Sequence, residues 1–368
     1  MSAAREHDRD GAAGAGGATT RDAARAALRR PAAARQSERG VALLLALLTM
    51  VLLTVVVIEF TVSSQVDYRR SVMWANGRRA ALVADGGVML AGEVLHEDAI
   101  LGDTDSLTDI WARELPPIDT GAGMLAVRIE DETAKLNLNE LAAGALSPSG
   151  RRFTSLLQKL NLDPQLAIPV ADWVDRNRDP GPGSLAAEDD WYLSNAKPPY
   201  TARNGALRSF AELALVRGFT PEILSKLRRY VTVLPDVSGK VNVNTALPEV
   251  LMAMDPRLDD SSTVQKLVEA RTVKPFEKVD ELATTGGLEA IPKAELERLF
   301  AFSSSWFRVR STGDVDGAMR SEEALLKRDS GSSKILYLLP RRGPNIVGLD
   351  SGVRGRLDDA GLLGASRR

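Results

Sequence analysis

Residues 39–58 read RGVALLLALLTMVLLTVVVI, and this stretch decides the fold. From Val41 to Ile58 it carries no charge, and Thr49 and Thr54 are its only polar residues. As a helix, the run spans roughly 27 Å, which is close to the thickness of a bilayer core. A buried core helix is the alternative, but an uncharged run of this length favours a membrane span.

The segment before the run, residues 1–40, is basic. It contains eight arginines and five acidic residues, is rich in Ala and Gly, and has few large apolar side chains. Such a segment cannot bury enough apolar surface to offset its conformational entropy, so we expect it to be a disordered leader. Because the positive charge precedes the span, we expect this side to stay in the cytoplasm and the bulk of the chain to lie outside it.

Beyond the span, we expect the helix to continue with one apolar face. Residues 41–62 would form its membrane-spanning half, and residues 63–134 its outer half together with the first strands. Read as a single helix, residues 41–97 measure about 85 Å, with weak points at Gly77, Gly86 and Gly87. Apolar residues recur there at steps of three, four or seven, as in an amphipathic helix: Val62, Val66, Met73, Ala80, Val83, Leu90 and Val94.

Three later segments have the pattern of strands. Residues 125–131 read LAVRIED and alternate apolar with charged side chains, which is typical of a half-buried strand. Residues 306–311 and 334–339 are the other two candidates. We therefore expect an α+β fold, in which a long N-terminal helix packs on a small antiparallel sheet and a helical domain is inserted between two strands. Residues 302–340 would hold the returning strands, and residues 341–368, rich in Gly, Arg and Asp, a disordered tail.

The expected insert contains an internal repeat. Residues 135–139 read KLNLN, and residues 240–244 read KVNVN. Each is followed by a helical region that ends on a similar pattern, FAEL at residues 210–213 and VDEL at residues 279–282. Two copies of one helical module are therefore predicted. Their expected bounds are residues 135–236 and 237–301.

The asparagines of the repeat, Asn137, Asn139, Asn242 and Asn244, are expected to be structural, because Asn side chains cap helices and turn the chain before them. The repeat also resembles helix-hairpin-helix and SAM-like modules, some of which bind DNA. However, residues 239–300 hold eight basic and eleven acidic residues, the wrong sign of charge for a phosphate-binding surface. We therefore expect no nucleic-acid partner, and keep a membrane-anchored periplasmic DNA-binding protein as the alternative function.

Composition restricts the chemistry. The chain has no Cys and only two His, His7 and His96. This excludes thiol nucleophiles, disulfides and zinc–thiolate sites, and leaves no basis for a Ser-His-Asp catalyst or a multi-histidine metal site. The formal net charge of −2 provides no global field that would attract nucleic acid or anionic lipid. We expect the protein not to be an enzyme.

The segment with the most side chains that could bind a cation is an acidic loop within residues 172–192. Asp175, Asn177 and Asp179 occupy alternate positions, an arrangement that lets their oxygens surround a hard cation. The spacing is not that of an EF-hand, because the sixth position is proline and the first glutamate, Glu188, is the fourteenth residue. Three interpretations remain: a solvated acidic loop, a calcium site that stiffens the loop, and a carboxylate-pair hydrolase.

The sequence around Gly40 resembles the cleavage site of type IV pilins and pseudopilins. In that class a prepilin peptidase cuts after a glycine on the cytoplasmic side of the helix, and Arg39-Gly40-Val41-Ala42-Leu43-Leu44 has the form of this site. The resemblance implies cleavage between Gly40 and Val41, and N-methylation of Val41. Most members have Glu as the fifth mature residue, whereas this chain has Leu45. Within the class, this absence is the mark of minor pseudopilin K of type II secretion.

The acidic loop and the segments after it are similar to the same family, and the likeness covers residues 39–340. The motifs that carry it are Asp172-Trp173-Val174-Asp175, Glu188-Asp189-x-x-Tyr192, Tyr200-Thr201-Ala202-Arg203-Asn204 and Glu212-Leu213-x-x-Val216-x-Gly218-Phe219. The resemblance implies calcium as a cofactor. Its ligands would be Asp175, Asn177, Asp179, Glu188 and Asp189, with Asp172 and Asp190 as further candidates.

The resemblance also implies a function and a location. A member of this family is expected to be a minor pseudopilin at the tip of the pseudopilus, where it helps initiate assembly for the export of folded proteins across the outer membrane. Its expected partners are minor pseudopilins I and J. It would cross the inner membrane once, with its C-terminal bulk in the periplasm.

Overall fold

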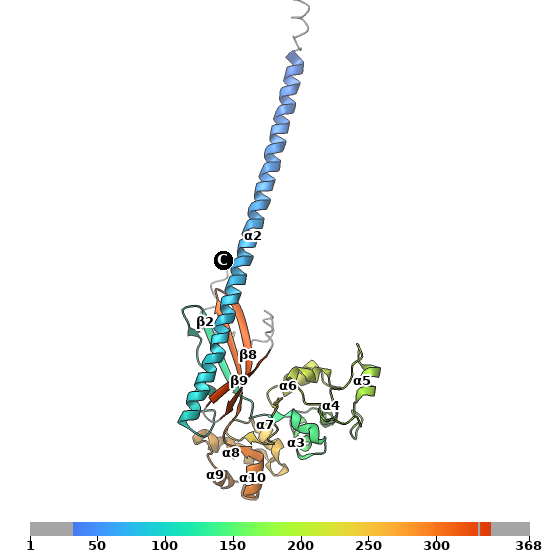
Figure 1. Ribbon diagram of the computed structural model, residues 1–368, viewed down its shortest axis with the longest axis vertical. Coiled ribbons are helices and arrows are strands. Elements are labelled where there is room, and N and C mark those ends of the chain that lie inside the picture. Colours follow the sequence, from blue (N-terminus) through green and yellow to red (C-terminus); the bar gives the residue numbers. More distant parts are fainter. Residues whose placement is uncertain (1–31, 330–331, 340–368) are drawn as a thin grey trace, which may run out of the picture. The chain divides into compact units, whose positions relative to one another are not determined.

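The computed structural model describes residues 32–329 and 332–339, so the expected tail at 341–368 lies outside the described residues. The chain divides between Val72 and Met73 into two compact units. The described part of the first unit is helix alone, and the second combines helix, sheet and a helical insert (Figure 1).

Helix α2 runs from Ala32 to Leu101. The single helix predicted over residues 41–97 is therefore confirmed. The disorder expected for residues 1–40 is wrong from Ala32 onward, because alanine is the best helix former and extending an existing helix is easy. Residues 1–31 lie outside the described residues.

The first part of α2 has the properties of a membrane span. Among the described residues, α2 is the one helix long and apolar enough to cross a membrane, and the 18-residue window that qualifies it has a mean hydropathy of 3.1 with no part buried. The two polar side chains of the run are satisfied within the helix. Thr49 donates to the carbonyl of Ala46 at 2.9 Å, and Thr54 to that of Met50 at 2.8 Å. This removes the cost of exposing a free hydroxyl to lipid.

The second unit contains a five-stranded antiparallel sheet in the order β1-β2-β7-β8-β9. The three predicted strands are confirmed as β2, β7 and β9. β8 is not recognisable as a strand from its sequence, because its Glu, Ala, Leu and Lys residues hide the alternation and favour helix locally. The bounds are β1 Ile118–Asp119, β2 Met124–Asp131, β7 Trp306–Val315, β8 Ala318–Asp329 and β9 Ser332–Leu339.

The C-terminal half of α2 packs on one face of this sheet. Val88, Ala91 and Leu95 form a buried cluster with sheet residues that include Phe307 and Leu326. The close approach depends on glycine at two positions, Gly87 on α2 and Gly313 on β7. A Cβ on Gly87 would lie 2.6 Å from Cδ1 of Leu125, and a Cβ on Gly313 would lie 3.0 Å from the backbone nitrogen of Ala84.

The helical insert lies between β2 and β7, and its two modules share one hydrophobic core. A short 3-10 helix, η1 (Ile110–Ala112), precedes the sheet. The elements of the first module are β3 Leu136–Asn137, η2 Leu138–Ala143, α3 Pro148–Lys159, η3 Pro164–Leu166, α4 Ala167–Val174, α5 Asp189–Asn195, η4 Phe210–Leu215, α6 Pro221–Leu227 and β4 Val231–Thr232. Those of the second are β5 Val241–Asn242, α7 Pro248–Met254, η5 Pro256–Leu258, α8 Ser261–Val273, α9 Val279–Ala283, α10 Lys293–Leu299 and β6 Phe300–Ala301.

The sequence repeat is also a repeat of hydrogen bonds. Asn139 donates to the carbonyl of Leu207 at 3.2 Å and accepts from its N–H at 2.7 Å. Asn244 makes the same pair of bonds with Phe276, both at 2.9 Å. In each module a two-residue strand at the start pairs in parallel with a two-residue strand at the end. These pairs are β3 with β4 in the first module and β5 with β6 in the second.

The expected capping role of the asparagines holds for Asn137, the N-cap of η2, whose side chain accepts from the N–H of Asn139. Asn242 accepts in the same way from the N–H of Asn244 at 2.9 Å. Asn139 and Asn244 are structural as expected, but their side chains cap no helix among the described residues and instead hold the backbone of a residue far along the chain. We call these two contacts, Asn139–Leu207 and Asn244–Phe276, the amide clamps.

Candidate functional site

The acidic loop begins where helix α4 ends and finishes at the start of α5. Asp175 is the C-cap of α4, a helix whose last residues are buried, and Glu188 is the N-cap of α5. Between them the alternating residues form successive turns. Asp175 accepts from the N–H of Asn177 at 3.2 Å, and Asn177 accepts from the N–H of Asp179 at 2.7 Å. These Asx turns use the side chains that the sequence pattern assigned to a cation.

Asp172 ties the loop to α4. In this buried side chain each carboxylate oxygen accepts one hydrogen bond. Oδ1 accepts from the N–H of Gly181 at 2.9 Å, and Oδ2 accepts from the N–H of Ala187 at 2.8 Å. Burial raises the pKa of Asp172, and the two backbone hydrogen bonds act against that rise. Since both oxygens already hold the backbone, the observed role of Asp172 is to fix the path of the loop.

An aromatic cluster supports the loop from within the first module. Trp173 packs edge-on against Tyr192, with 5.2 Å between ring centroids, and Tyr192 stacks on Tyr200 at 5.3 Å. The hydroxyl of Tyr192 accepts from the N–H of Arg217, whose side chain in turn donates to the carbonyl of Ala186 in the loop at 2.8 Å. The Asp-Trp and Tyr motifs therefore build the base on which the loop rests.

Glu188 is the exceptional side chain of the loop. Only 6% of its surface is exposed, and among the described residues neither carboxylate oxygen has a hydrogen-bond partner. Burial, together with the charges of Asp172, Asp175 and Asp189, raises the pKa of Glu188 to about 7. A buried carboxylate without a partner is costly, and a bound cation is one way of removing that cost.

The predicted ligands differ in how far the structure buries them. Asp175 and Glu188 are buried and Asp189 is half-buried, whereas Asn177, Asp179 and Asp190 are exposed. Asp189 also accepts from the N–H of Ala202 at 2.9 Å. No three acidic side chains of this loop have ligand atoms within 4.8 Å of one another in the described structure. Glu188, buried without a hydrogen-bond partner among the described residues, and Asp175, whose charge acts on it, are oxygen donors of the kind that calcium takes.

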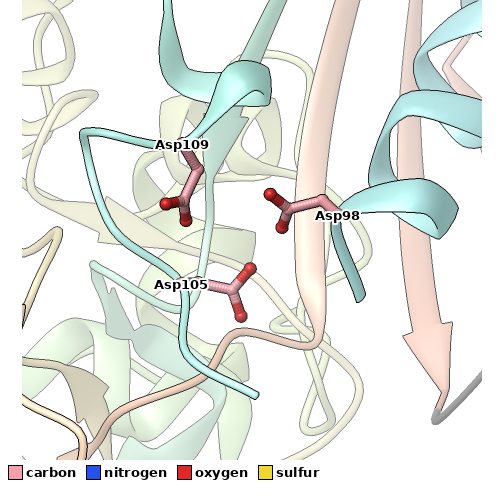
Figure 2. A group of neighbouring side chains, drawn as sticks. All are labelled: Asp98, Asp105 and Asp109. Carbon is pink, nitrogen blue, oxygen red and sulfur yellow. The ribbon is translucent and has the colours of Figure 1, made fainter. Parts of the chain in front are cut away.

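One acidic group does meet that distance, and no pattern in the sequence indicates it. Asp98, at the end of α2, and Asp105 and Asp109, in the segment that follows, direct their carboxylates toward one another (Figure 2). Arg328 on β8 neutralises much of this charge, because it donates to Asp98 at 3.2 Å and also to Asp105. Asp109 accepts from the N–H and hydroxyl of Ser106. We therefore interpret the group as a structural ion-pair network that fastens α2 to the sheet.

The expected processing site lies in the first part of α2. Gly40 and Val41 are both exposed on the helix, and no atom lies within 4 Å of a Cβ built on Gly40. Leu45, at the position where most pilin-like proteins are expected to carry glutamate, is also exposed on the helix surface.

Comparison with known proteins identifies the family. Two sequence models described as "Type II secretion system (T2SS), protein K" match residues 134–236 and 241–303. The type II secretion system protein K of Pseudomonas aeruginosa is 33% identical over 261 residues, which cover 67% of this chain and 76% of that protein. The Klebsiella pneumoniae protein of the same name is 27% identical over 305 residues, covering 79% of this chain and 93% of the relative.

A solved structure has the same fold. It is a chain in the crystal structure of the GspK-GspI-GspJ complex from the enterotoxigenic Escherichia coli type 2 secretion system, with a TM-score of 0.61 and 22% identity. The match covers 75% of this chain and 97% of that one. None of these matches supports the DNA-binding alternative. The chain belongs to the type II secretion system protein K family.

Proposed function

We propose that this protein is a minor pseudopilin at the tip of the type II secretion pseudopilus, where it helps initiate assembly for the export of folded proteins across the outer membrane. The observation that carries this proposal is the helical insert between Asp131 and Trp306. Two modules with their own core make the part of the chain beyond the membrane span too wide to be repeated along a pseudopilus in which subunits pack tightly in a helical array. A tip subunit needs partners below it only.

The surface of α2 supports assembly through helix packing. Beyond the apolar run, this helix exposes large side chains that no described part of the chain covers, among them Tyr68, Trp74, Leu82 and Met89. Apolar and aromatic side chains on one helix are typical of packing against other helices. The partners we propose are minor pseudopilins I and J, by analogy with the complex in which the related fold was solved.

The position of the apolar run supports a single-pass inner-membrane protein with the C-terminal bulk in the periplasm. Prepilin peptidase would cut between Gly40 and Val41 and methylate the new terminus on Val41. A cleaved chain with Leu45 at its fifth position has no carboxylate there to pair with the terminal amine of a neighbour, which fits a subunit that begins a filament.

We further propose that the acidic loop binds calcium and that the two modules, of SAM-like or helix-hairpin-helix-like type, are a scaffold without enzymatic activity. Glu188 and Asp175 would hold the ion, with Asp189, Asn177 and Asp179 as additional ligands. Calcium prefers oxygen ligands in flexible arrangements, and here it would supply positive charge to a buried carboxylate that has no other partner. The ion would thus stabilise the path of the loop between α4 and α5.

The test is a deletion of the gene in its own host, complemented by the full chain. Exported proteins should accumulate in the periplasm of the deletion strain and return to the medium on complementation. A matched variant that lacks the residues between Asp131 and Trp306, joined by a short linker, should fail to complement. Normal secretion in the deletion strain would refute the proposal.

A further inference from the structure

Residues 97–110, which we call the α2–η1 segment, comprise the end of α2, the start of η1 and the residues between them. Four of their large apolar side chains are exposed, by 64% at Ile100, 84% at Leu101, 56% at Leu107 and 51% at Ile110. Single exposed apolar residues are ordinary, but four of them within eleven residues are typical of an interaction site.

Hydrogen bonds hold this segment in one conformation. The N–H of Asp105 donates to the carbonyl of Phe302 at 3.0 Å, and the N–H of Ser304 donates to the carboxylate of Asp105 at 2.6 Å. The ligand oxygens of Asp98, Asp105 and Asp109 lie within 4.8 Å of one another, so the two ends of the segment lie close together (Figure 2). A fixed backbone therefore presents the exposed side chains, which reduces the ordering cost of binding.

The α2–η1 segment is also negatively charged. It contains five acidic residues and no basic one. Arg328 pairs with two of the carboxylates, and Arg113, just beyond the segment, donates to one of its carbonyls. Glu97 and Asp103 are exposed, and neither has an ion pair within the described residues. An occupant that complements this surface combines apolar and basic residues.

The tail of the chain has that composition. Residues 341–368, which lie outside the described residues, contain six arginines and three aspartates as their only charged side chains. A segment of this kind has too little apolar surface to form a core of its own, but it can fold against a complementary surface. Its large apolar residues are Ile346, Val347, Leu349, Val353, Leu357, Leu362 and Leu363.

The tail begins within reach of the α2–η1 segment. Arg328, which contacts the segment, is paired in the β8–β9 ladder with Ser333, six residues before the end of β9 at Leu339. Six strand residues correspond to roughly 20 Å. The GPN sequence at residues 343–345 favours a reversal of the chain, and the ten residues from Leu339 to Leu349 span up to about 33 Å when extended.

We propose that the tail folds back onto the α2–η1 segment, with its arginines beside Glu97 and Asp103 and its leucines and valines against the exposed apolar side chains. A tethered segment has an effective concentration in the millimolar range, so weak contacts are enough to dock it. A separate partner protein must also offset the translational and rotational entropy that it loses on binding. The docked tail covers an apolar patch that would otherwise favour association with other proteins.

Disulfide cross-linking tests this contact, because the chain has no Cys of its own. The full chain in detergent carries Leu107→Cys together with either Leu349→Cys or Leu357→Cys, and is oxidised mildly. An intramolecular disulfide should form in at least one of these pairs, as mass spectrometry of the digested protein would detect. Leu146→Cys, at a side chain of the first module that is 71% exposed, is the matched control and should cross-link to the same tail cysteine about tenfold more slowly.

The charge of the tail should also affect the rate. Arg354→Glu combined with Arg356→Glu changes the tail alone and should slow the cross-link to Leu107→Cys about tenfold, because attraction to the acidic segment becomes repulsion. Equal rates at the Leu107 and Leu146 positions, or a rate that charge reversal leaves unchanged, would overturn the proposal. The absence of a cross-link from both tail cysteines would also overturn it. Disulfides that form only between chains would overturn it in favour of a second copy as the occupant.

Discussion

Thr245 donates its hydroxyl hydrogen to Asp131, with 2.5 Å between Oγ1 and Oδ2, across 114 residues of sequence. The same carboxylate oxygen accepts from Ser304 at 2.5 Å and from Asn242 at 3.4 Å. Asp131 is the last residue of β2, and its partners belong to the second module and to the segment that returns to the sheet. This one buried side chain therefore joins the insert to the strand from which it departs.

Asp131→Asn should change how stability depends on pH. Burial, opposed by the bonds from Ser304 and Thr245, raises the pKa of Asp131 to about 6. A raised pKa in the folded state contributes stability below the ordinary pKa, and that contribution is lost as pH rises through 6. The stability of the variant relative to the wild type should therefore increase between pH 4 and pH 7. Urea unfolding across this range measures it, and parallel pH profiles for the two proteins would contradict the network.

Glu132→Gln should have the opposite pH dependence. Burial favours the neutral form of Glu132, but Lys135 and Arg308 prevail and hold the pKa of this carboxyl well below its usual range. The stability from this pairing is present above the ordinary pKa and is lost as pH falls through the depressed one. At pH 7 the variant should lose about 3 kcal/mol, because two half-buried cations each lose one counter-charge. This loss in the free energy of unfolding should shrink toward pH 2, as urea unfolding at each pH would measure. Glu297→Gln, on an exposed face of α10, is the control and should show no such pH dependence.

Two adjacent glycines of α2 should respond oppositely to alanine. At Gly87 the new methyl group would lie 2.6 Å from Leu125 and 3.0 Å from Val127, so Gly87→Ala should destabilise the fold by about 1–3 kcal/mol. At Gly86 nothing lies within 4 Å, so Gly86→Ala should stabilise the helix by up to about 1 kcal/mol. Thermal unfolding of the two variants tests the contact between α2 and the sheet, and equal effects would refute it.

The effect of Glu188→Gln on the melting temperature should have opposite signs in EDTA and in calcium. In EDTA the variant should melt higher than the wild type, because it removes a buried charge that has no partner. In calcium the order should invert, since the wild type gains about 2.7 kcal/mol at a hundred times its Kd and the variant loses a ligand. Glu297→Gln, which changes an exposed side chain of α10 outside the loop, should melt like the wild type in both buffers. A wild-type melting temperature that EDTA leaves unchanged would exclude the calcium site.

Gly40→Val should leave the leader attached. A side chain at the position before the cut blocks a peptidase that requires glycine, so the chain recovered from membranes should keep the mass of residues 1–40. Secretion of exported proteins should fall with it. Ser37→Ala, three residues upstream, should be processed normally. A mature mass in the Gly40→Val strain would disprove cleavage at this bond.

The parts of the fold that follow from local pattern could be predicted from the sequence. An uncharged run indicates the apolar part of α2, alternation indicates β2, and a repeated pentapeptide indicates two modules. β8 could not be recognised, because its strand state depends on pairing with β7 and β9 rather than on its own residues. The ion pair of Arg328 with Asp105 was hidden for a related reason, since it joins residues 223 positions apart.

The candidate calcium site was only partly predictable. Alternate spacing selects Asn177 and Asp179, but local turns use the side chain of Asn177, and both residues are exposed. The decisive property of Glu188, burial without a hydrogen-bond partner among the described residues, depends on how the loop folds over the aromatic cluster. No spacing rule contains that information, because burial is decided by contacts distant in sequence.

The amide clamps have a consequence for how this family can vary. The clamp of the first module closes over 68 residues and that of the second over 32, yet the bonds at the two closure points match. The longer span holds the whole acidic loop. Because the entropy of closing a loop rises only slowly with its length, a closed frame of this kind tolerates insertions between its fixed ends. The first module can therefore gain or lose a binding loop over evolutionary time while its scaffold stays the same.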